Sequence, residues 1–318
     1  MKKLKKGDHI RVVSPSSSIQ SIGGFDANVR AKEKLEELSF NVSFSSNYFE
    51  HDLFDSASIA SRVEDLHEAF LDPSVDAILA TIGGFNCNEL LPYLNYDLIA
   101  QNPKIICGYS DTTALLNAIY AKTGIQTYMG PSYSSFKMKE GQEYQSQSWL
   151  KAVTQDNYDL VPSKEWSSDP WYDPTQPRHF MPTEWKVYKA GKASGIAIGG
   201  NLSTFALLRG TPYAPQVENY VLFVEEAEGY PPEHFLREFA ALLQAYPNPQ
   251  AVIIGRFPKE CEMTEEILLA ILDKHPLLKT IPVLYDVDFA HTQPLFTITI
   301  GGQVTLDTEK MVIHVQTK

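Results

Sequence analysis

Short apolar runs alternate with helix-patterned segments through the first 135 residues, and this alternation constrains the fold more than any other feature of the chain. The runs expected as strands are Ile10–Val13, Val42–Phe44, Ala77–Ile82, Lys104–Cys107 and Gln126–Met129. The segments expected as helices are Phe25–Leu38, Ile59–Leu71 and Thr113–Lys122. Strands that alternate with helices predict a parallel sheet covered on both faces, and uninterrupted apolar strands agree with burial on both sides.

A second α/β pattern follows a polar, proline- and tryptophan-containing stretch at 137–185. The expected strands are Ser194–Ile198, Tyr220–Val224, Ala251–Ile254 and Pro282–Tyr285, and the expected helices are Asn201–Leu208, Glu233–Ala245 and Thr264–Asp273. A closing hairpin is expected from Leu295–Ile300 and Val304–Leu306, turned by Gly301 and Gly302. We therefore predict an N-terminal nucleophile-bearing domain (1–136), a linker and aromatic-rich loop (137–185), and a C-terminal domain (186–318).

Charge and cysteine usage narrow the class of partner and compartment. The formal net charge is −12, and a nucleic-acid polymer is not expected because phosphate neutralisation needs a basic face. No apolar run approaches the roughly 18 residues that span a bilayer, so no membrane partner is expected. Cys87, Cys107 and Cys261 lack metal-ligand spacing and suit a reducing compartment. With no apolar signal segment after the basic N-terminus, we expect a cytoplasmic protein without a metal or cofactor.

Ser110 is the candidate nucleophile. The expected strand Lys104–Cys107 runs into Gly108-Tyr-Ser-Asp and then into a helix, which is the strand–turn–helix order of a nucleophile elbow. Such a turn lifts the hydroxyl above the sheet edge, beside the free N–H groups of the helix N-terminus. Thr112 stands where the usual Gly-x-Ser-x-Gly pattern has its second glycine, and Ser110 or Asp111 also fits a plain helix cap.

Gly83 and Gly84 directly follow the expected buried strand Ala77–Ile82. Two glycines in this position allow unusual backbone angles and a close approach to a ligand. Their amides are candidates for an oxyanion hole, in which one donor contributes about 2.7–4 kcal/mol. The segment has neither of the usual phosphate-loop patterns, so a standard nucleotide-binding motif is not predicted. A plain tight turn is the alternative.

A serine nucleophile needs a base, and the base needs an orienting partner. His291 follows the expected strand Pro282–Tyr285 and lies in a loop, where catalytic side chains are often held. Glu225 and Glu226 end the strand Tyr220–Val224, where a carboxylate is placed to accept the histidine Nδ1–H. A loop histidine also fits a structural role, and the acidic pair also fits a strand end that turns into solvent.

With these residues in place, the chain resembles the LD-carboxypeptidase family of serine peptidases (peptidase family S66). The likeness is carried by stretches that span nearly the whole chain in the order of the family. They are GDHIRVVSPSS (7–17), GGFNCNELLPYL (83–94), PKIICGYSDTTAL (103–115), GGNLS (199–203) with GTPY (210–213), and LFVEE (222–226) followed by DFAHTQP (288–294).

The resemblance implies a Ser–Glu–His triad made of Ser110, Glu225 and His291. The implied oxyanion-hole amides are those of Gly84, Phe85 and Asp111. The implied fold is a Rossmann-like parallel-sheet N-terminal domain plus a smaller α/β C-terminal domain, with the site between them. A homodimer is also implied, because homodimers are usual in this family.

The family has a branch that removes the terminal D-alanine from murein tetrapeptides and a branch that resembles the microcin C self-immunity protein. The second cleaves the amide that joins a carboxyl group to a nucleotide-like moiety. The stretch 83–94 resembles this second branch, so we expect a small peptide or aminoacyl-nucleotide substrate. Expected substrate contacts are Asn201, Asn86 and Trp171, the last by stacking on a base. Asn201 equally fits a helix N-cap, and the lysine that often follows the acidic pair is absent.

Three other functions stay open at this stage. The same triad serves a murein LD-carboxypeptidase, and it also serves an esterase. A different class is a non-catalytic protein that binds a small metabolite at the edge of the sheet, for which Ser110, Glu225 and His291 need not converge.

Overall fold

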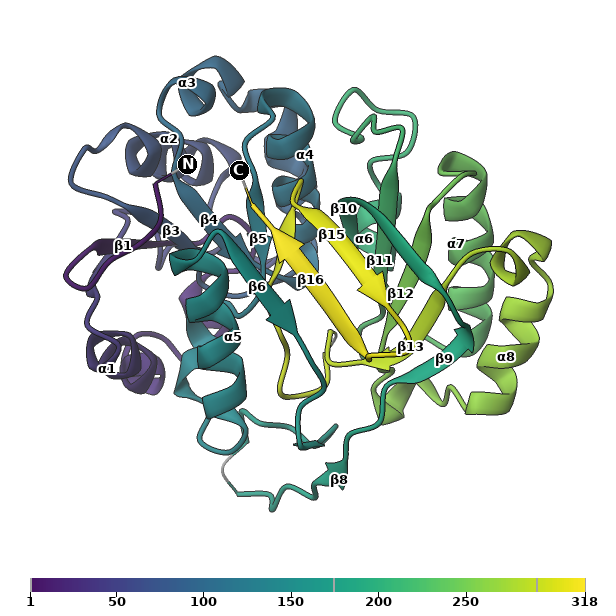
Figure 1. The fold of residues 1–318 in the computed structure, drawn as a ribbon. Helices are drawn as coiled ribbons and strands as arrows, with labels where there is room; N and C mark the ends of the chain where they lie inside the picture. Colours follow the sequence, from purple (N-terminus) through teal and green to yellow (C-terminus); the bar gives the residue numbers. More distant parts are fainter. Residues whose placement is uncertain (1, 174, 290, 318) are drawn as a thin grey trace.

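The computed structural model describes residues 2–173, 175–289 and 291–317, and two sheets lie side by side in it (Figure 1). The first sheet has the order β14-β5-β4-β3-β1-β2. Its strands are β1 (His9–Val13), β2 (Asn41–Phe44), β3 (Ala77–Ala80), β4 (Ile105–Gly108), β5 (Thr127–Met129) and β14 (Ile298–Ile300). β1 to β5 run parallel, and β14 joins the edge antiparallel to β5.

Helices cover the first sheet as the apolar strands predict. They are α1 (Val29–Glu37), α2 (Ile59–Leu71), α3 (Tyr96–Gln101) and α4 (Thr113–Thr123). Every residue of β3 and β4 is buried, because the sheet is covered on both faces. The Ser58 hydroxyl accepts a hydrogen bond from the Ser61 amide and so begins α2 at the expected residue. The α/β prediction for this part of the chain is confirmed.

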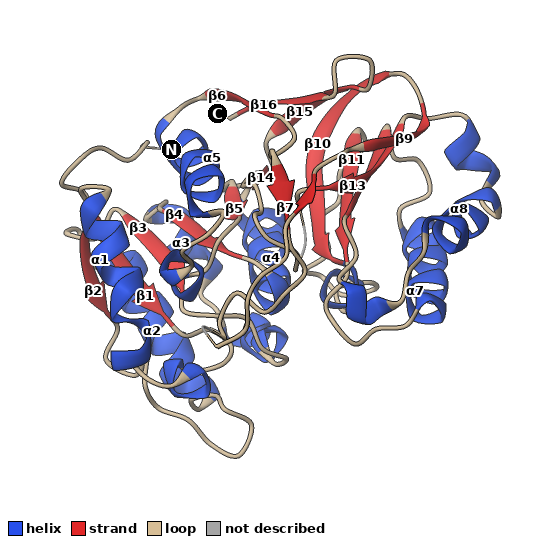
Figure 2. Cartoon of the chain, turned by 90° about the horizontal axis from the view of Figure 1, so that it is seen from below, coloured by secondary structure: helices blue, strands red, loops and turns tan. Residues whose placement is uncertain are grey.

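The second sheet has the order β6-β16-β15-β10-β11-β12-β13-β9. Its strands are β6 (Asn157–Leu160), β9 (Lys186–Lys189), β10 (Lys192–Asn201), β11 (Tyr220–Glu225), β12 (Ala251–Gly255), β13 (Val283–Val287), β15 (Gln303–Asp307) and β16 (Val312–Gln316). β10 to β13 are parallel, and antiparallel strands flank them on both sides. Its helices are α6 (Leu202–Ala206), α7 (Pro232–Ala245) and α8 (Glu265–Asp273). Figure 2 shows α7 and α8 together on one face of this sheet.

The hairpin expected from Leu295–Ile300 and Val304–Leu306 does not form. Its first strand, β14, pairs with β5 of the first sheet, whereas β15 pairs with β10 and β16 of the second. Gly301, at φ +80°, makes the turn that the two glycines predict, but the turn carries the chain from one sheet to the other. An alternating pattern with a glycine turn specifies two strands and does not specify their partners.

The stretch 137–185, expected as a linker and an aromatic-rich loop, contains regular secondary structure. It begins with α5 (Gln142–Thr154), continues as β6 at the edge of the second sheet, and then forms a small ribbon of β7 (Glu165–Trp166) and β8 (Met181–Pro182). The glutamines and serines of α5 hide its apolar side in the sequence. Trp149 on that side is 1% exposed and packs edge-on against Phe40 and Phe136. Ala152 and Val153 are also fully buried, together with polar residues such as Gln145, so the sequence of α5 shows no clear apolar helical pattern.

Helix α4 joins the two sheets. Its Asn117 amide donates to the Gly199 carbonyl at 2.8 Å and accepts from the Gly199 amide at 3.2 Å, which fastens α4 to β10. A Cβ at Gly200, where φ is +136°, would lie 2.7 Å from Thr113 of α4, so this close approach requires glycine. Among the described residues, none of the helices has the length and apolar character needed to cross a bilayer.

Candidate active site

Ser110 lies in a sharp turn between β4 and α4. Its φ of +59° places it in the left-handed region, which is unusual for a non-glycine residue and costs on the order of 1–3 kcal/mol. Tyr109 before it is extended, and Ser110 begins a single 3₁₀ turn that leads into α4. The backbone therefore turns Ser110 out of the sheet at the carboxyl end of β4, as the elbow pattern predicts.

The glycine turn after β3 packs directly against Ser110. A Cβ at Gly83 would lie 2.8 Å from the Ser110 Cβ and 2.9 Å from its Oγ, so only glycine fits there. A Cβ at Gly84, where φ is +152°, would lie 2.3 Å from the Ser16 Oγ and 2.5 Å from the Ser17 Oγ. Sequence reasoning emphasised the Gly84 amide, whereas the structure gives Gly83 the tightest contact with the serine.

The Asp111 carboxylate ties three loops together. It accepts hydrogen bonds from the Ser16 hydroxyl at 2.5 Å and the Cys87 amide at 2.7 Å, and the residue is 3% exposed. Burial raises the pKa of Asp111, against the effect of these hydrogen bonds. The side chain therefore holds the loop after β1 and the glycine turn beside Ser110, while its own carboxyl group is occupied.

Glu225 and His291 come together from two parts of the second domain. Glu225 ends β11 and is fully buried, and its Oε2 lies 2.7 Å from His291 Nδ1. The other imidazole nitrogen, Nε2, lies 3.0 Å from the Ser110 Oγ. A carboxylate only accepts, so Nδ1 carries a proton and donates it to Glu225. In the neutral imidazole, Nε2 is then free to accept from the serine hydroxyl.

Glycine at position 255 allows the His291 loop to reach Glu225. A Cβ there would lie 1.6 Å from the Phe289 carbonyl oxygen and 2.8 Å from the Glu225 Cβ. The end of β12 thus passes between the acid and the backbone just before the histidine. Any side chain at Gly255 would push this loop away from β11.

Burial and charge act on the pKa of His291 in opposite directions. Burial disfavours the imidazolium and lowers the pKa, whereas the charge and hydrogen bond of Glu225 raise it, and Glu228 and Glu226 add to the increase. The acidic groups prevail and raise the pKa of His291 to about 9. The imidazolium form of His291 is thus favoured beside Glu225 despite its burial.

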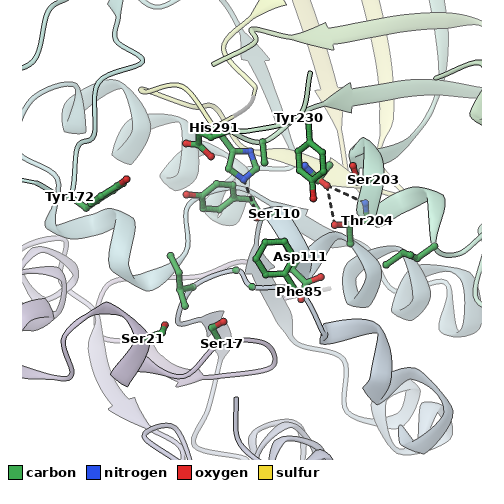
Figure 3. Close-up of a pocket in the computed structure, with 18 of the residues that line it drawn as sticks. Ser17, Ser21, Phe85, Ser110, Asp111, Tyr172, Ser203, Thr204, Tyr230 and His291 are labelled. Atoms are coloured by element: carbon green, nitrogen blue, oxygen red, sulfur yellow. Dashed lines mark hydrogen bonds between the residues drawn. The ribbon is translucent and has the colours of Figure 1, made fainter. Parts of the chain in front are cut away.

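A pocket of about 520 Å³ opens over Ser110 and His291 (Figure 3). This volume suits a small ligand. In the close-up, Ser110 and His291 point toward one another, Phe85 and Asp111 lie below them, and Tyr172 lies on the side opposite Ser203 and Thr204. The lining also includes Ser17, Ser21, Ile82, Gly83, Gly84, Tyr109, Trp171, Asn201, Leu207, Ala227, Glu228 and Tyr230.

The three expected oxyanion-hole residues and two of the three expected substrate contacts line this pocket. Asn201 is 4% exposed, and its Oδ1 caps α6 by accepting from the Thr204 amide and hydroxyl. Its Nδ2 has no partner within the described chain, so the cap and a ligand-facing donor coexist in one side chain. Asn86 does not line the pocket. Its Nδ2 donates to the Ser56 hydroxyl and its Oδ1 accepts from Arg62, so both ends of the side-chain amide are bonded within the protein.

Sequence reasoning missed a second carboxylate–histidine pair beside the pocket. The Glu226 side chain is buried, accepts from the Ser203 hydroxyl at 2.9 Å and lies 3.1 Å from His234 Nδ1. Tyr230, which lines the pocket, packs on the His234 ring with centroids 4.4 Å apart. Glu225 and Glu226 thus contact two different histidines, and no sequence motif marks His234, the third residue of α7.

A serine at a strained strand–helix turn, facing a histidine held by a buried carboxylate, has the geometry of a serine hydrolase. Residues 10–130 match the family model of the LD-carboxypeptidase N-terminal domain, and residues 194–306 match that of the LD-carboxypeptidase C-terminal domain. The chain belongs to the LD-carboxypeptidase family of peptidases, as the resemblance indicated.

Similar proteins cover nearly the whole chain. YocD of Bacillus subtilis is 43% identical over 309 residues, which are 96% of this chain and 95% of YocD. The crystal structure of an MccF-like protein from Bacillus anthracis superimposes with a TM-score of 0.95 at 44% identity, covering 100% of this chain and 99% of that one. These likenesses place the chain beside the MccF-like proteins of the family.

The microcin C7 self-immunity protein MccF of Escherichia coli is 31% identical over 330 residues, which are 98% of this chain and 94% of MccF. A structure of MccF in complex with glutamyl sulfamoyl guanosine has a TM-score of 0.90 and covers 99% of this chain and 98% of that one. Another MccF structure holds aspartyl sulfamoyl adenosine. Those ligands are aminoacyl nucleoside analogues.

Proposed function

We propose that this protein is a serine amidase of the microcin C immunity type, which hydrolyses a small aminoacyl- or peptidyl-nucleotide amide. His291 takes the proton of Ser110, whose Oγ attacks the amide carbonyl. The backbone amides of Gly84, Phe85 and Asp111 stabilise the oxyanion. His291 then protonates the leaving nitrogen, and water releases the acyl group from Ser110. Glu225 orients the imidazole and stabilises the imidazolium.

The continuous hydrogen-bonded chain from Glu225 through His291 to Ser110 carries this proposal. The distances, 2.7 Å and 3.0 Å, are those of working hydrogen bonds, and the left-handed Ser110 turn adds a strained backbone where function is commonly found. A non-catalytic binding protein has no need of this convergence. The convergence of these three side chains therefore favours catalysis over passive binding.

The aromatic wall and the charge of the pocket bear on the substrate. Trp171 and Tyr172 line one side, where a base would stack, and stacking contributes about 1–3 kcal/mol. Among the described residues, the lining includes no lysine or arginine, and it includes the exposed carboxylate of Glu228. This charge favours an aminoacyl group with a free ammonium and disfavours a phosphate dianion close to Glu228.

The decisive experiment offers two substrates to the purified protein and identifies the products by mass spectrometry. One is aspartyl sulfamoyl adenosine, and the other is a murein tetrapeptide that ends in an L,D-bond to D-alanine. We expect release of aspartate from the first, and loss of that activity by at least about 10³-fold in Ser110→Ala with binding retained. Release of D-alanine alone would replace our proposal with a murein carboxypeptidase. Retained turnover in Ser110→Ala would overturn the mechanism for either substrate.

The esterase alternative needs a separate comparison. A matched ester and amide with the same aminoacyl group share binding contacts and differ in the bond that is cut. A protein evolved for amides must protonate a poor leaving group, and His291 is placed to do so. We expect turnover of the amide, and turnover of the ester without the amide would contradict the amidase assignment.

A further inference from the structure

The Asp288 carboxylate, just beyond β13, is fully buried and accepts several hydrogen bonds. Its Oδ2 accepts from the Ser163 amide at 2.8 Å and from the Trp185 Nε1 at 2.9 Å. Its Oδ1 accepts from the Ser163 hydroxyl at 2.9 Å and from an Arg256 Nη at 3.1 Å. A carboxylate offers about four lone-pair sites, and here every one is used.

Two of these donor residues, Ser163 and Trp185, stand at the two ends of one segment. We name residues 163–185 the pocket segment, because the chain leaves Asp288 at Ser163, lines the pocket with Trp171 and Tyr172, and returns to the same carboxylate at Trp185. A single side chain therefore closes the base of the segment that makes the aromatic wall.

Asp288 also closes the loop that carries His291. Its main-chain carbonyl accepts from the Phe296 amide at 2.8 Å, so the two ends of this loop meet at Asp288. Two residues past the histidine, Gln293 exchanges backbone hydrogen bonds with Ser167 of the pocket segment, at 2.8 Å and 3.0 Å. The histidine loop and the pocket segment are thus joined to each other as well as to Asp288.

Arg256 balances the buried charge and extends the connection. Its guanidinium pairs with Asp288, donates to the Asp286 carbonyl at 2.9 Å, and lies 4.4 Å from the centroid of the Trp166 ring. Every lone pair of the buried carboxylate has a partner, and loss of one partner would leave an uncompensated charge or donor. The arrangement accordingly has one well-defined geometry.

We propose that Asp288 is a positioning residue that fixes the His291 loop and the pocket segment in one register, so that the base and the aromatic wall face the same substrate. The inference rests on the proposed function, because it assigns His291 to proton transfer and the pocket segment to substrate contact. Asp288 itself does not line the pocket and acts through these two elements.

Asp288→Asn tests the proposal with a minimal change of shape. The amide nitrogen donates and cannot accept, so it confronts one of the N–H groups of Ser163, Trp185 or Arg256. We expect kcat to fall and KM to rise, each by about tenfold, because both the base and the wall shift. We also expect proteolytic cleavage within residues 163–185 under native conditions to become at least about tenfold faster.

Asp65→Asn is the matched control. Asp65 is 3% exposed and accepts from the Ser45 hydroxyl at 2.6 Å and the Asn47 side chain at 3.0 Å, far from the His291 loop in the chain. This variant should lose stability, while kcat and KM per folded molecule and cleavage of the pocket segment stay as in the wild type. The contrast separates positioning from a general loss of folded protein.

Trp185→Phe keeps the proposal testable if Asp288→Asn does not fold. It removes the Nε1 donor and keeps an aromatic ring against Phe296. We expect KM to rise by roughly threefold to tenfold and proteolytic cleavage of the pocket segment to become faster. Unchanged kinetics and unchanged cleavage in Trp185→Phe would overturn the proposal, as would Asp288→Asn behaving like Asp65→Asn.

The proteolysis measurement uses no substrate. If the wild type lacks amidase activity but Asp288→Asn loosens residues 163–185, the proposed function fails and the structural connection stands. If the wild type is active and neither the kinetics nor the cleavage responds to Asp288→Asn, the positioning role fails and the proposed function stands.

Discussion

The Ser110 turn and the His291 loop meet at one hydrogen bond, but they are built in different ways. The serine is placed by backbone geometry: a left-handed φ between β4 and α4, with Gly83 pressed against it. The histidine is placed by polar contacts from distant segments, namely Glu225 on β11 and the pocket segment through Asp288. Ser110 should therefore be misplaced by steric crowding, and His291 by loss of the charge or hydrogen bonds that hold it.

Removing the charge of Glu225 should cause the largest loss of kcat. Glu225→Gln keeps the shape of the side chain, but an amide does not stabilise the imidazolium and does not enforce the reactive tautomer. We expect kcat to fall by about 10⁴-fold in steady-state assays, with a much smaller change in KM. The adjacent Glu226→Gln is the control, because Glu226 pairs with His234; its effect should stay below about tenfold. Equal losses in both variants would contradict the choice of acid.

Crowding the Ser110 turn should have the next largest effect. The methyl group of Gly83→Ala must displace the Ser110 side chain, and a misplacement of about 1 Å commonly costs 100-fold in kcat/KM. Gly124→Ala is the control: φ there is +73° and nothing lies within 4 Å, so it strains the backbone without touching the pocket. If Gly83→Ala has the same kcat/KM as Gly124→Ala, the steric account of the nucleophile is wrong.

The smallest expected change is a shift in the pH dependence of kcat/KM, which reports on His291 specifically. The pKa of His291 is raised to about 9 and the base must be neutral, so kcat/KM should increase with pH and level off above that value. Glu228→Gln removes a negative charge that favours the imidazolium, so the ascending limb should move to lower pH. An ascending limb at the wild-type pH in Glu228→Gln would show that Glu228 does not raise the pKa of His291.

Stability should respond to pH in the opposite sense. The folded-state pKa of His291 lies above its value of about 6.5 in an unfolded chain. The Glu225–His291 pair therefore stabilises the fold fully below pH 6.5, roughly, and loses that contribution as pH rises through about 9. Activity and this part of the stability thus change in opposite directions across the same interval.

The sequence located the elements whose signals are contiguous. Helix α2 begins and ends at the expected residues, and the Ser110 turn was found because strand, serine and helix follow one another directly. The pairing of Glu225 with His291 is different, since 66 positions separate them and no local pattern states that the ends of β11 and β13 converge. That pairing came from the family resemblance.

The residues that sequence reasoning misjudged share a physical cause. Asn86 looks the same in a sequence whether it faces a ligand or bonds Arg62, and helix α5 looks polar although Trp149 buries its inner side. The role of Asp288 was not visible in the family stretch, because its four hydrogen bonds come from three residues distant from it in the sequence, Ser163, Trp185 and Arg256. Partners that meet only in three dimensions leave no spacing to detect.

The antiparallel strand β14 has a consequence for how the chain is made. β5 is the last strand that the N-terminal 136 residues contribute to the first sheet. Its outer neighbour, β14, consists of residues 298–300 and is synthesised much later. A ribosome that has released the first domain has therefore released an unpaired apolar edge, which is a template for association with other chains. Residues 298–300 complete the first sheet, so translation that stops short of them leaves this sheet without its edge strand.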